Sequence, residues 1–135
     1  VKAYYKDSEE VIVKTTEAEK IKMPMVVLVN GNTSSCSELM AFALRDLANA
    51  QIVGSSTYGK GVMQTTHKLS GGAAIKITVA TLQTEKSGDY NGIGIKPNFE
   101  VSIPAEIDIN ALNNEEQLLY DSQLIKAIEV ITTIN

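Results

Sequence analysis

Short apolar runs in the first part of the chain predict strands. Residues 25–30, MVVLVN, form a continuous run rich in β-branched side chains, which is typical of a strand buried on both faces of a parallel sheet. Residues 51–54, QIVG, predict a second short buried strand. Residues 1–5 and 10–15 are two further predicted strands, and the polar turn at 6–8 joins them.

A helical period lies between the two buried strands. Over residues 37–49, apolar side chains recur at helical spacing on a stripe formed by Leu39, Phe42, Ala43 and Leu47 and widened by Met40 and Leu44. A strand, a helix and a strand in this order predict a βαβ unit.

The second half of the chain has a different pattern. Residues 61–69 and 73–84 flank Ser70-Gly71-Gly72, which predicts a β-hairpin. Residues 91–103 are broken by glycines and then extended. An amphipathic helix is predicted from about 121 to 131, with Asp121 as its N-cap and with Leu124, Ala127, Ile128 and Ile131 on one face. We therefore expect an α/β fold in which a short mixed sheet carries a helix, a hairpin and a C-terminal helix.

Composition limits the classes of function. The 135 residues suffice for one domain with a core, and the net charge of −4 gives no electrostatic footprint for nucleic acid. A lone Cys36 excludes an internal disulfide and a cysteine-based structural zinc site. No apolar run reaches the length of a membrane span, and we expect no signal peptide within these residues. Because the sequence begins with Val1 and not with Met, we expect a chain from which any targeting segment has been removed.

Four hydroxyl side chains gather in residues 31–40, GNTSSCSELM, where the buried strand turns into the helix. Ser35 and Glu38 fit the capping-box pattern S-x-x-E, so one hydroxyl is expected to cap the helix. A serine at this edge of a parallel sheet is also a candidate nucleophile, since the helix N-terminus offers amide donors for an oxyanion. The two interpretations are compatible, but a serine nucleophile needs a base.

Two residues are candidates for that base. His67 is the only histidine and lies in a strand-like segment, where a surface position is the usual outcome. Lys60 follows a predicted buried strand, and Gly59 and Gly61 on either side permit unusual backbone angles and close approach. A lysine acts as a base only when its surroundings lower its pKa to roughly 7–8. Gln64, four residues later, could orient the amine; the alternative is a solvated lysine in a turn.

A phosphate-binding loop is a third interpretation of the same stretch. Gly54, Gly59 and Lys60 match the front of the pattern G-x-x-x-x-G-K-[ST]. Gly61 stands where that pattern needs a hydroxyl, and a predicted strand follows where it needs a helix N-terminus. Both departures argue against nucleotide binding.

Four segments in a fixed order carry a resemblance to a known family. VVLVNGNTSSCSE, VGSSTYGKGVMQ, GGAAIKITVATLQT and GIGIKPNFEV resemble the C-terminal processing peptidases, or tail-specific proteases, from about 25 to 101, and YDSQLIKAIEVI resembles their closing helix. The resemblance implies a Ser/Lys dyad with Ser35 as nucleophile, Lys60 as general base and Gln64 as its supporter. It also implies that the amide of Cys36 is one oxyanion donor.

The resemblance has departures and gaps. Ser34 and Cys36 stand where the family usually has alanine, so Ser34 is a second candidate nucleophile, and Cys36 is expected to be a small packed residue. The family's PDZ domain is absent, as is the upstream Gly-rich segment that supplies the other oxyanion donor. We therefore expect residues 1–135 to be the C-terminal portion of a crotonase-like catalytic domain, with little or no activity when isolated.

The implied activity is serine endoproteolysis near the C-terminus of protein substrates, without a metal or other cofactor. The implied partners are protein or peptide substrates together with the upstream segment and PDZ domain of a longer chain, and the implied location is outside the cytoplasm, in a periplasm, an envelope or a lumen. The alternative is an inactive peptidase-like domain that binds peptides or acts as a scaffold. The presence of Ser35, Lys60 and Gln64 together argues against that alternative.

Overall fold

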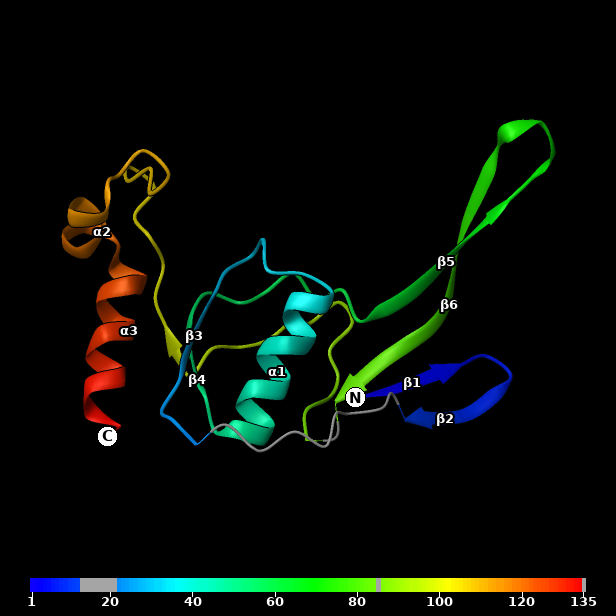
Figure 1. Ribbon diagram of the computed structural model, residues 1–135, viewed down its shortest axis with the longest axis horizontal. Helices are drawn as coiled ribbons and strands as arrows, with labels where there is room; N and C mark the ends of the chain where they lie inside the picture. The colour runs from blue at the N-terminus through cyan, green and yellow to red at the C-terminus, as the bar shows by residue number, and fades with distance from the viewer. Residues whose placement is uncertain (13–21, 85, 135) are drawn as a thin grey trace.

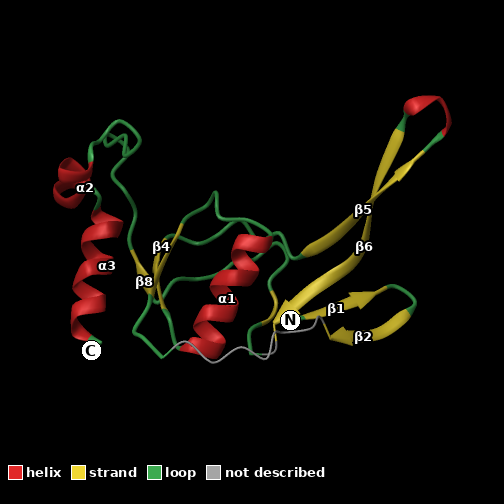
Figure 2. Cartoon of the chain, in the orientation of Figure 1, coloured by secondary structure: helices red, strands yellow, loops and turns green. Residues whose placement is uncertain are grey.

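The structure, a computed structural model, describes residues 1–12, 22–84 and 86–134. These residues form a mixed α/β arrangement (Figures 1 and 2). In chain order the elements are β1 (Lys2–Tyr5), β2 (Ser8–Ile12), β3 (Val26–Val29), α1 (Cys36–Ala48), β4 (Gln51–Gly54), β5 (Val62–Lys68), the 3₁₀ turn η1 (Ser70–Gly72), β6 (Ala74–Thr84), β7 (Gly88–Asp89), β8 (Phe99–Glu100), α2 (Asn114–Tyr120) and α3 (Ser122–Thr133).

The strands form two sheets, where the sequence predicted one short mixed sheet. One sheet is parallel, in the order β3-β4-β8; the other is antiparallel, in the order β2-β1-β6-β5, with β7 paired to β6. Helix α3 packs against β3 and β4, and α1 packs against β4 and β6, so that α1 lies between the two sheets (Figure 1). Parallel strands need helical cover, whereas antiparallel hairpins tolerate an open face. The segregation into two sheets follows from this difference.

The predicted βαβ unit is confirmed as β3, α1 and β4. The two strands pair in parallel register, from Val26 opposite Gln51 to Val29 opposite Gly54. Gly54 has a φ of 135°, and a Cβ there would lie 1.8 Å from the carbonyl oxygen of Val29. Only glycine allows this pair of strands to close at the end that faces the site.

The buried face of α1 differs from the predicted stripe. Ala41 and Phe42 are buried in the core, and Glu38 is buried beside them. Met40 and Leu47, both on the predicted stripe, are 62% and 60% exposed. The helical spacing of apolar residues therefore predicted the helix correctly, but the buried face is narrower than the predicted stripe. Part of the buried surface is occupied by the polar side chain of Glu38.

The buried face of α3 agrees only in part with the predicted face, which it shares at Ala127. Gln123, Ala127 and Val130 are buried, whereas Ile128 is 42% exposed. Gln123 is accommodated because its Nε2 donates to the carbonyl oxygen of Val101 at 2.8 Å. The predicted N-cap is confirmed: the Asp121 carboxylate accepts the first amides of α3.

Helix α2 was not predicted. It is capped by Asn113, whose side chain accepts from the amides of Glu115 and Glu116. Its apolar residues Leu118 and Leu119 remain exposed, so no buried stripe marks it in the sequence.

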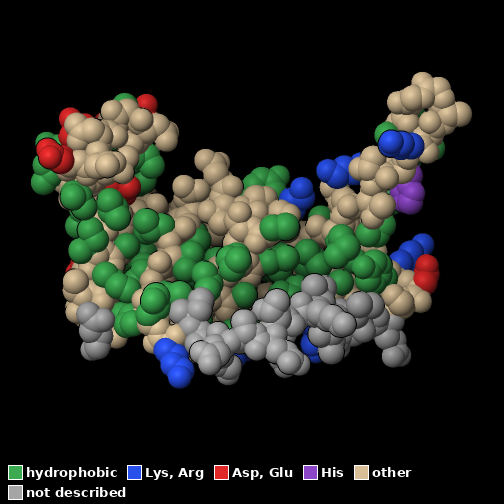
Figure 3. All heavy atoms as spheres, viewed as in Figure 1, with side chains coloured by type: hydrophobic (Ala, Val, Ile, Leu, Met, Phe, Trp, Pro, Cys, Tyr) green, Lys and Arg blue, Asp and Glu red, His purple; other side chains and the backbone are tan. Residues whose placement is uncertain are grey.

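The two predicted hairpins are present, with shifted bounds. The 3₁₀ turn η1 joins β5 to β6, and together they form an arm that projects from the rest of the molecule (Figures 1 and 3). Strand β2 begins at Ser8, which was predicted to lie in the turn, and residues 13–15 of that predicted strand lie outside the described residues.

The core contains an aromatic pair. The rings of Phe42 and Tyr90 have centroids 4.9 Å apart, and Tyr90 is 1% exposed. Burial is the main cause that raises the pKa of the Tyr90 hydroxyl, and the negative charge of Glu38 adds to it. Among the described residues no helix is both long and apolar enough to cross a membrane.

Candidate active site

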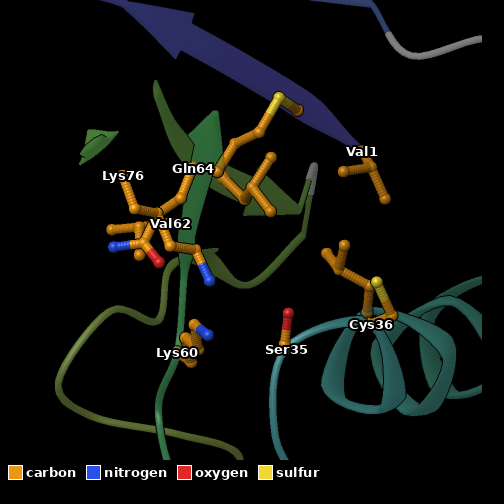
Figure 4. Close-up of a pocket in the computed structure, with 10 residues that line it drawn as sticks. Val1, Ser35, Cys36, Lys60, Val62, Gln64 and Lys76 are labelled. Carbon is orange, nitrogen blue, oxygen red and sulfur yellow. The ribbon is translucent and has the colours of Figure 1, made fainter. Parts of the chain in front are cut away.

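Ser35 occupies the N-cap position of α1, so the helix begins one residue earlier than predicted. Its φ of 58° and ψ of −118° lie outside the regions that serine normally adopts. The Ser35 backbone N–H donates to Oε2 of Glu38 at 2.9 Å, which is one arm of the capping box. The capping box predicted from Ser35 and Glu38 is present, because the Ser35 side chain also lies toward the Glu38 N–H, although not in the geometry of a full hydrogen bond. The Ser35 hydroxyl also faces the pocket described below (Figure 4).

Glu38 is the centre of the site, and its side chain has no solvent exposure. Its Oε2 accepts both the Ser35 N–H, at 2.9 Å, and the Lys60 N–H, at 2.8 Å. Its Oε1 accepts the Thr57 hydroxyl, at 2.5 Å, and the Gly59 N–H, at 2.7 Å. The two segments that contain the candidate nucleophile and the candidate base thus meet on one carboxylate.

The four donors determine the protonation of Glu38. Burial alone raises the pKa of the carboxyl, but the hydrogen bonds from Thr57, Lys60, Gly59 and Ser35 together outweigh burial and hold that pKa below its ordinary value of 4.5. The group is therefore a carboxylate at neutral pH, and its charge is fully compensated by donors.

The loop 55–61 is held from its other side by the turn 90–95. The Thr57 hydroxyl accepts the Ile95 N–H at 2.7 Å, and the Gly59 carbonyl accepts the Gly92 N–H at 2.8 Å. Gly59 has a φ of 85°, and a Cβ on it would lie 2.9 Å from the backbone nitrogen of Gly94. The prediction that the glycine before Lys60 permits an unusual angle and close approach is confirmed.

The side chains of Ser35, Cys36, Lys60 and Gln64 line one open pocket of about 390 Å³ (Figure 4). Most of its other walls are apolar side chains from α1, β5 and β6. The Ser35 hydroxyl and the Lys60 side chain enter the pocket from adjacent segments of backbone (Figure 4). Sequence reasoning thus selected residues that the fold brings together.

Lys60 is half-buried as a residue, and its amine has no hydrogen bond or ion pair with any described residue. Gln64 was expected to orient it. Instead the Gln64 Nε2 donates to the Thr78 hydroxyl at 3.2 Å, across the β5–β6 hairpin. The pairing of these strands shifts register between Met63 and Gln64. That shift places Gln64 opposite Thr78, whose hydroxyl accepts the bond from its amide nitrogen.

Cys36 is exposed, so the expectation of a packed residue was wrong. As the first residue of α1 its side chain points away from the core, toward the pocket (Figure 4). Its N–H donates to no backbone carbonyl of the described residues, as is usual for the first amides of a helix. This amide is free to bind an anionic oxygen.

The remaining candidates lie apart from the pocket. Ser34 is not among its lining residues, and its carbonyl accepts the Ser37 N–H at 3.2 Å. His67 is exposed on β5, opposite Ile75, and does not line the pocket either. Strand β5 begins two residues after Lys60, so the helix that a phosphate-binding loop needs is absent from this place.

Sequence reasoning noted Glu38 only as a capping residue and gave no role to Thr57. The pattern S-x-x-E was a sufficient signal for the hydrogen bond that the Glu38 carboxylate accepts from the Ser35 N–H. No local pattern signals the bonds from Glu38 to the loop that contains Thr57, because their donors lie 19 to 22 residues further along the chain.

Known proteins match this chain in sequence and in fold. A sequence model described as "Peptidase family S41" matches residues 1–101. The "Carboxy-terminal processing protease CtpA" of Bacillus subtilis (strain 168) is 36% identical over 100 residues, which are 74% of this chain and 22% of that protein. The chain thus spans about a fifth of the length of this curated relative.

Two solved structures share the arrangement. A "photosystem II D1 C-terminal processing protease" has a TM-score of 0.54 at 43% identity, over 60% of this chain and 22% of that one. A "putative peptidase from Parabacteroides merdae" has a TM-score of 0.66 at 17% identity, over 96% of this chain and 41% of that one, which shows likeness of fold alone. With the family match over residues 1–101, these similarities lead to one conclusion: the chain belongs to peptidase family S41.

Proposed function

We propose that this chain is part of the catalytic domain of a serine endopeptidase that cleaves protein substrates near their C-terminus. One observation carries the proposal: Ser35 and Lys60 donate their backbone N–H groups to the same oxygen of Glu38, and their side chains line the same pocket. The relatives' names, which describe proteases that process C-termini, support the choice of reaction.

In this proposal the Ser35 Oγ attacks the carbonyl carbon of the scissile peptide bond. The neutral amine of Lys60 takes the hydroxyl proton and later gives it to the leaving amine. The Cys36 N–H donates to the oxyanion, and water then hydrolyses the acyl-enzyme. A supporting role for Gln64 requires its Oε1, which the bond from Nε2 to Thr78 does not use, to accept from the Lys60 amine.

We further propose that the parallel sheet and α1 belong to a crotonase-like core within a longer catalytic domain. The small share of its relatives' length that the chain spans supports this view. An upstream segment would supply a second oxyanion donor, and a PDZ domain would hold the substrate. Likeness to the family supports a location for such a protein outside the cytoplasm, in a periplasm, an envelope or a lumen.

The test compares three variants of the full-length protein. Ser35→Ala and Lys60→Ala are each expected to lower kcat/KM to near background, because the members of a dyad act as a unit. His67→Ala, on the exposed arm, is expected to keep most of the activity. Cleavage of a denatured protein, followed by mass spectrometry of the products, measures all three. Substantial turnover by Lys60→Ala would remove Lys60 from the role of base.

A binding domain without cleavage is the second candidate. The observation that favours it is the unsupported Lys60 amine, since Gln64 is bonded to Thr78. It predicts that the wild-type protein and Ser35→Ala bind a substrate peptide equally well and that neither cleaves it. The same set of proteins therefore decides between the two functions.

A further inference from the structure

Among the described residues, α1 and α2 both begin with a capping box, but the glutamates of the two boxes differ in what else they bind. In α2 the Glu116 carboxylate accepts the N–H of its N-cap, Asn113, at 2.9 Å. In α1 the Glu38 carboxylate accepts the N–H of Ser35, also at 2.9 Å. Glu116 is half-buried and makes only this local bond, whereas Glu38 has no exposure and accepts three more. Helix capping therefore explains one of the four bonds of Glu38.

The other three bonds all reach one loop. Their donors are Thr57, Gly59 and Lys60, in the loop that contains the candidate base. The direct main-chain hydrogen bond between this loop and the Ser35 segment is the one from the Tyr58 N–H to the Thr33 carbonyl, at 3.0 Å. It lies on the exposed side, where Tyr58 is 67% exposed. On the buried side, the side chain of Glu38 connects the loop to the Ser35 segment.

We infer that Glu38 is a positioning residue for the Ser35–Lys60 pair, and this inference rests on the proposed function. A carboxylate has about four lone-pair sites, and here four donors use them. Because one oxygen accepts the N–H of both Ser35 and Lys60, the rigid carboxylate sets the distance between the two backbones. It also holds Ser35 in its strained conformation. Glu38 itself does not line the pocket, so it acts only through its neighbours.

The isosteric change Glu38→Gln tests this role. A glutamine keeps the volume but turns one acceptor oxygen into an NH₂ group, which would face two hydrogen-bond donors. The matched control is Glu116→Gln, which weakens the capping box of α2 and touches neither Ser35 nor Lys60. Both variants are made in the full-length protein, next to the wild type and Ser35→Ala.

Two measurements are made on each protein. The first is kcat and KM per folded molecule across pH, because loss of folded protein lowers the rate without moving the limb of the profile that reports the base. Glu38→Gln is expected to lower kcat by on the order of a hundredfold at similar KM and to move that limb, because misplaced reacting groups lose most of the rate. Glu116→Gln is expected to match the wild type. An unchanged kcat and profile in Glu38→Gln would overturn the inference.

The second measurement is amide hydrogen exchange in residues 33–38 and 57–61. Faster exchange in both segments of Glu38→Gln, but not of Glu116→Gln, is expected; unchanged exchange would overturn the inference. This readout does not require activity. A wild type without Ser35-dependent cleavage would refute the proposed function alone, whereas normal cleavage and exchange in Glu38→Gln would refute the positioning role alone.

A milder pair of variants covers the case in which Glu38→Gln does not fold. Thr57→Val removes one donor to Oε1 of Glu38 at nearly constant volume, and Thr57→Ser keeps it. Positioning predicts that kcat falls about tenfold in Thr57→Val and is restored in Thr57→Ser, since a hydrogen bond to a charged group is stronger than one between neutral groups. Equal kcat in the two variants would contradict it.

Discussion

At the scale of single residues, the decisive side chain is a buried charge. Glu38 has no solvent exposure, yet burial does not neutralise it, because three N–H groups and one hydroxyl replace the water it loses. An unpaired carboxylate in the same place would be strongly destabilising. The stability of the site therefore depends on the charged form of this group.

Acid should weaken this contribution, and the sign follows from the pKa. The folded-state pKa of Glu38 lies below its ordinary value of 4.5, so its contribution to stability is complete above pH 4.5 and is lost as pH falls through the folded pKa. Urea denaturation of the wild type and Glu38→Gln, from neutral pH to below 4.5, measures this effect. The difference between their free energies of unfolding should shrink on acidification. A difference that grew instead would mean that the folded pKa is raised.

At the scale of elements, the site depends on contacts between turns as much as on the βαβ unit. The turn 90–95 touches the loop 55–61 so closely that a Cβ on Gly94 would lie 2.3 Å from the carbonyl oxygen of Thr57. Two residues earlier, Gly92 has nearly the same φ, 76° against 75°, but nothing lies within 4 Å of its Cβ position. Substitutions at these two glycines therefore share the cost of the left-handed backbone, but only the substitution at Gly94 adds a steric clash.

We expect Gly92→Ala to cost about 1–2 kcal/mol of stability, which is the penalty of the left-handed conformation alone. Gly94→Ala carries the same penalty and in addition forces Thr57 away, which should add about 1–3 kcal/mol, as overpacking does. Denaturant unfolding of both variants measures the difference. Equal costs would show that the two turns move apart freely, and Glu38 would then not depend on this contact.

At the scale of the whole molecule, the pocket is open and its wall is incomplete for the proposed reaction. The Cys36 N–H beside the pocket donates to no backbone carbonyl of the described residues, and the Lys60 amine lacks a partner among them. The chain spans about a fifth of the curated relative from Bacillus subtilis, and the proposed function assigns the completion of the site to other parts of a longer protein.

The isolated 135-residue chain is accordingly expected to show little or no Ser35-dependent proteolysis. Loss of one oxyanion donor costs roughly 3–4 kcal/mol, on the order of a hundred- to a thousandfold in rate, and loss of substrate positioning adds to it. The assay compares the chain with its Ser35→Ala variant on a denatured protein. Clear cleavage by the first and none by the second would show that these residues suffice.

The sequence was sufficient to predict the elements that depend on a local pattern of apolar and capping residues. The apolar runs 25–30 and 51–54 and the helical period between them led to the βαβ unit, and the Asp121 cap marked α3. Helix α2 was not predicted because it buries no stripe of apolar side chains. The partner of Gln64 could not be predicted either, since a register shift in the hairpin decides it. The residues themselves led to a possible site at Ser35 and Lys60, and resemblance assigned their roles, but the bonds that join their segments depend on three-dimensional contact.

The oxygen that Ser35 and Lys60 share has a consequence for anyone who would transplant this site into another scaffold. A graft of the serine turn alone would leave the Glu38 carboxylate with its single capping bond, and a graft of the lysine loop alone would leave three donors unsatisfied. The unit that can be moved is the pair of segments with the turn 90–95 behind them. The site is thus a module made of three discontinuous pieces of chain.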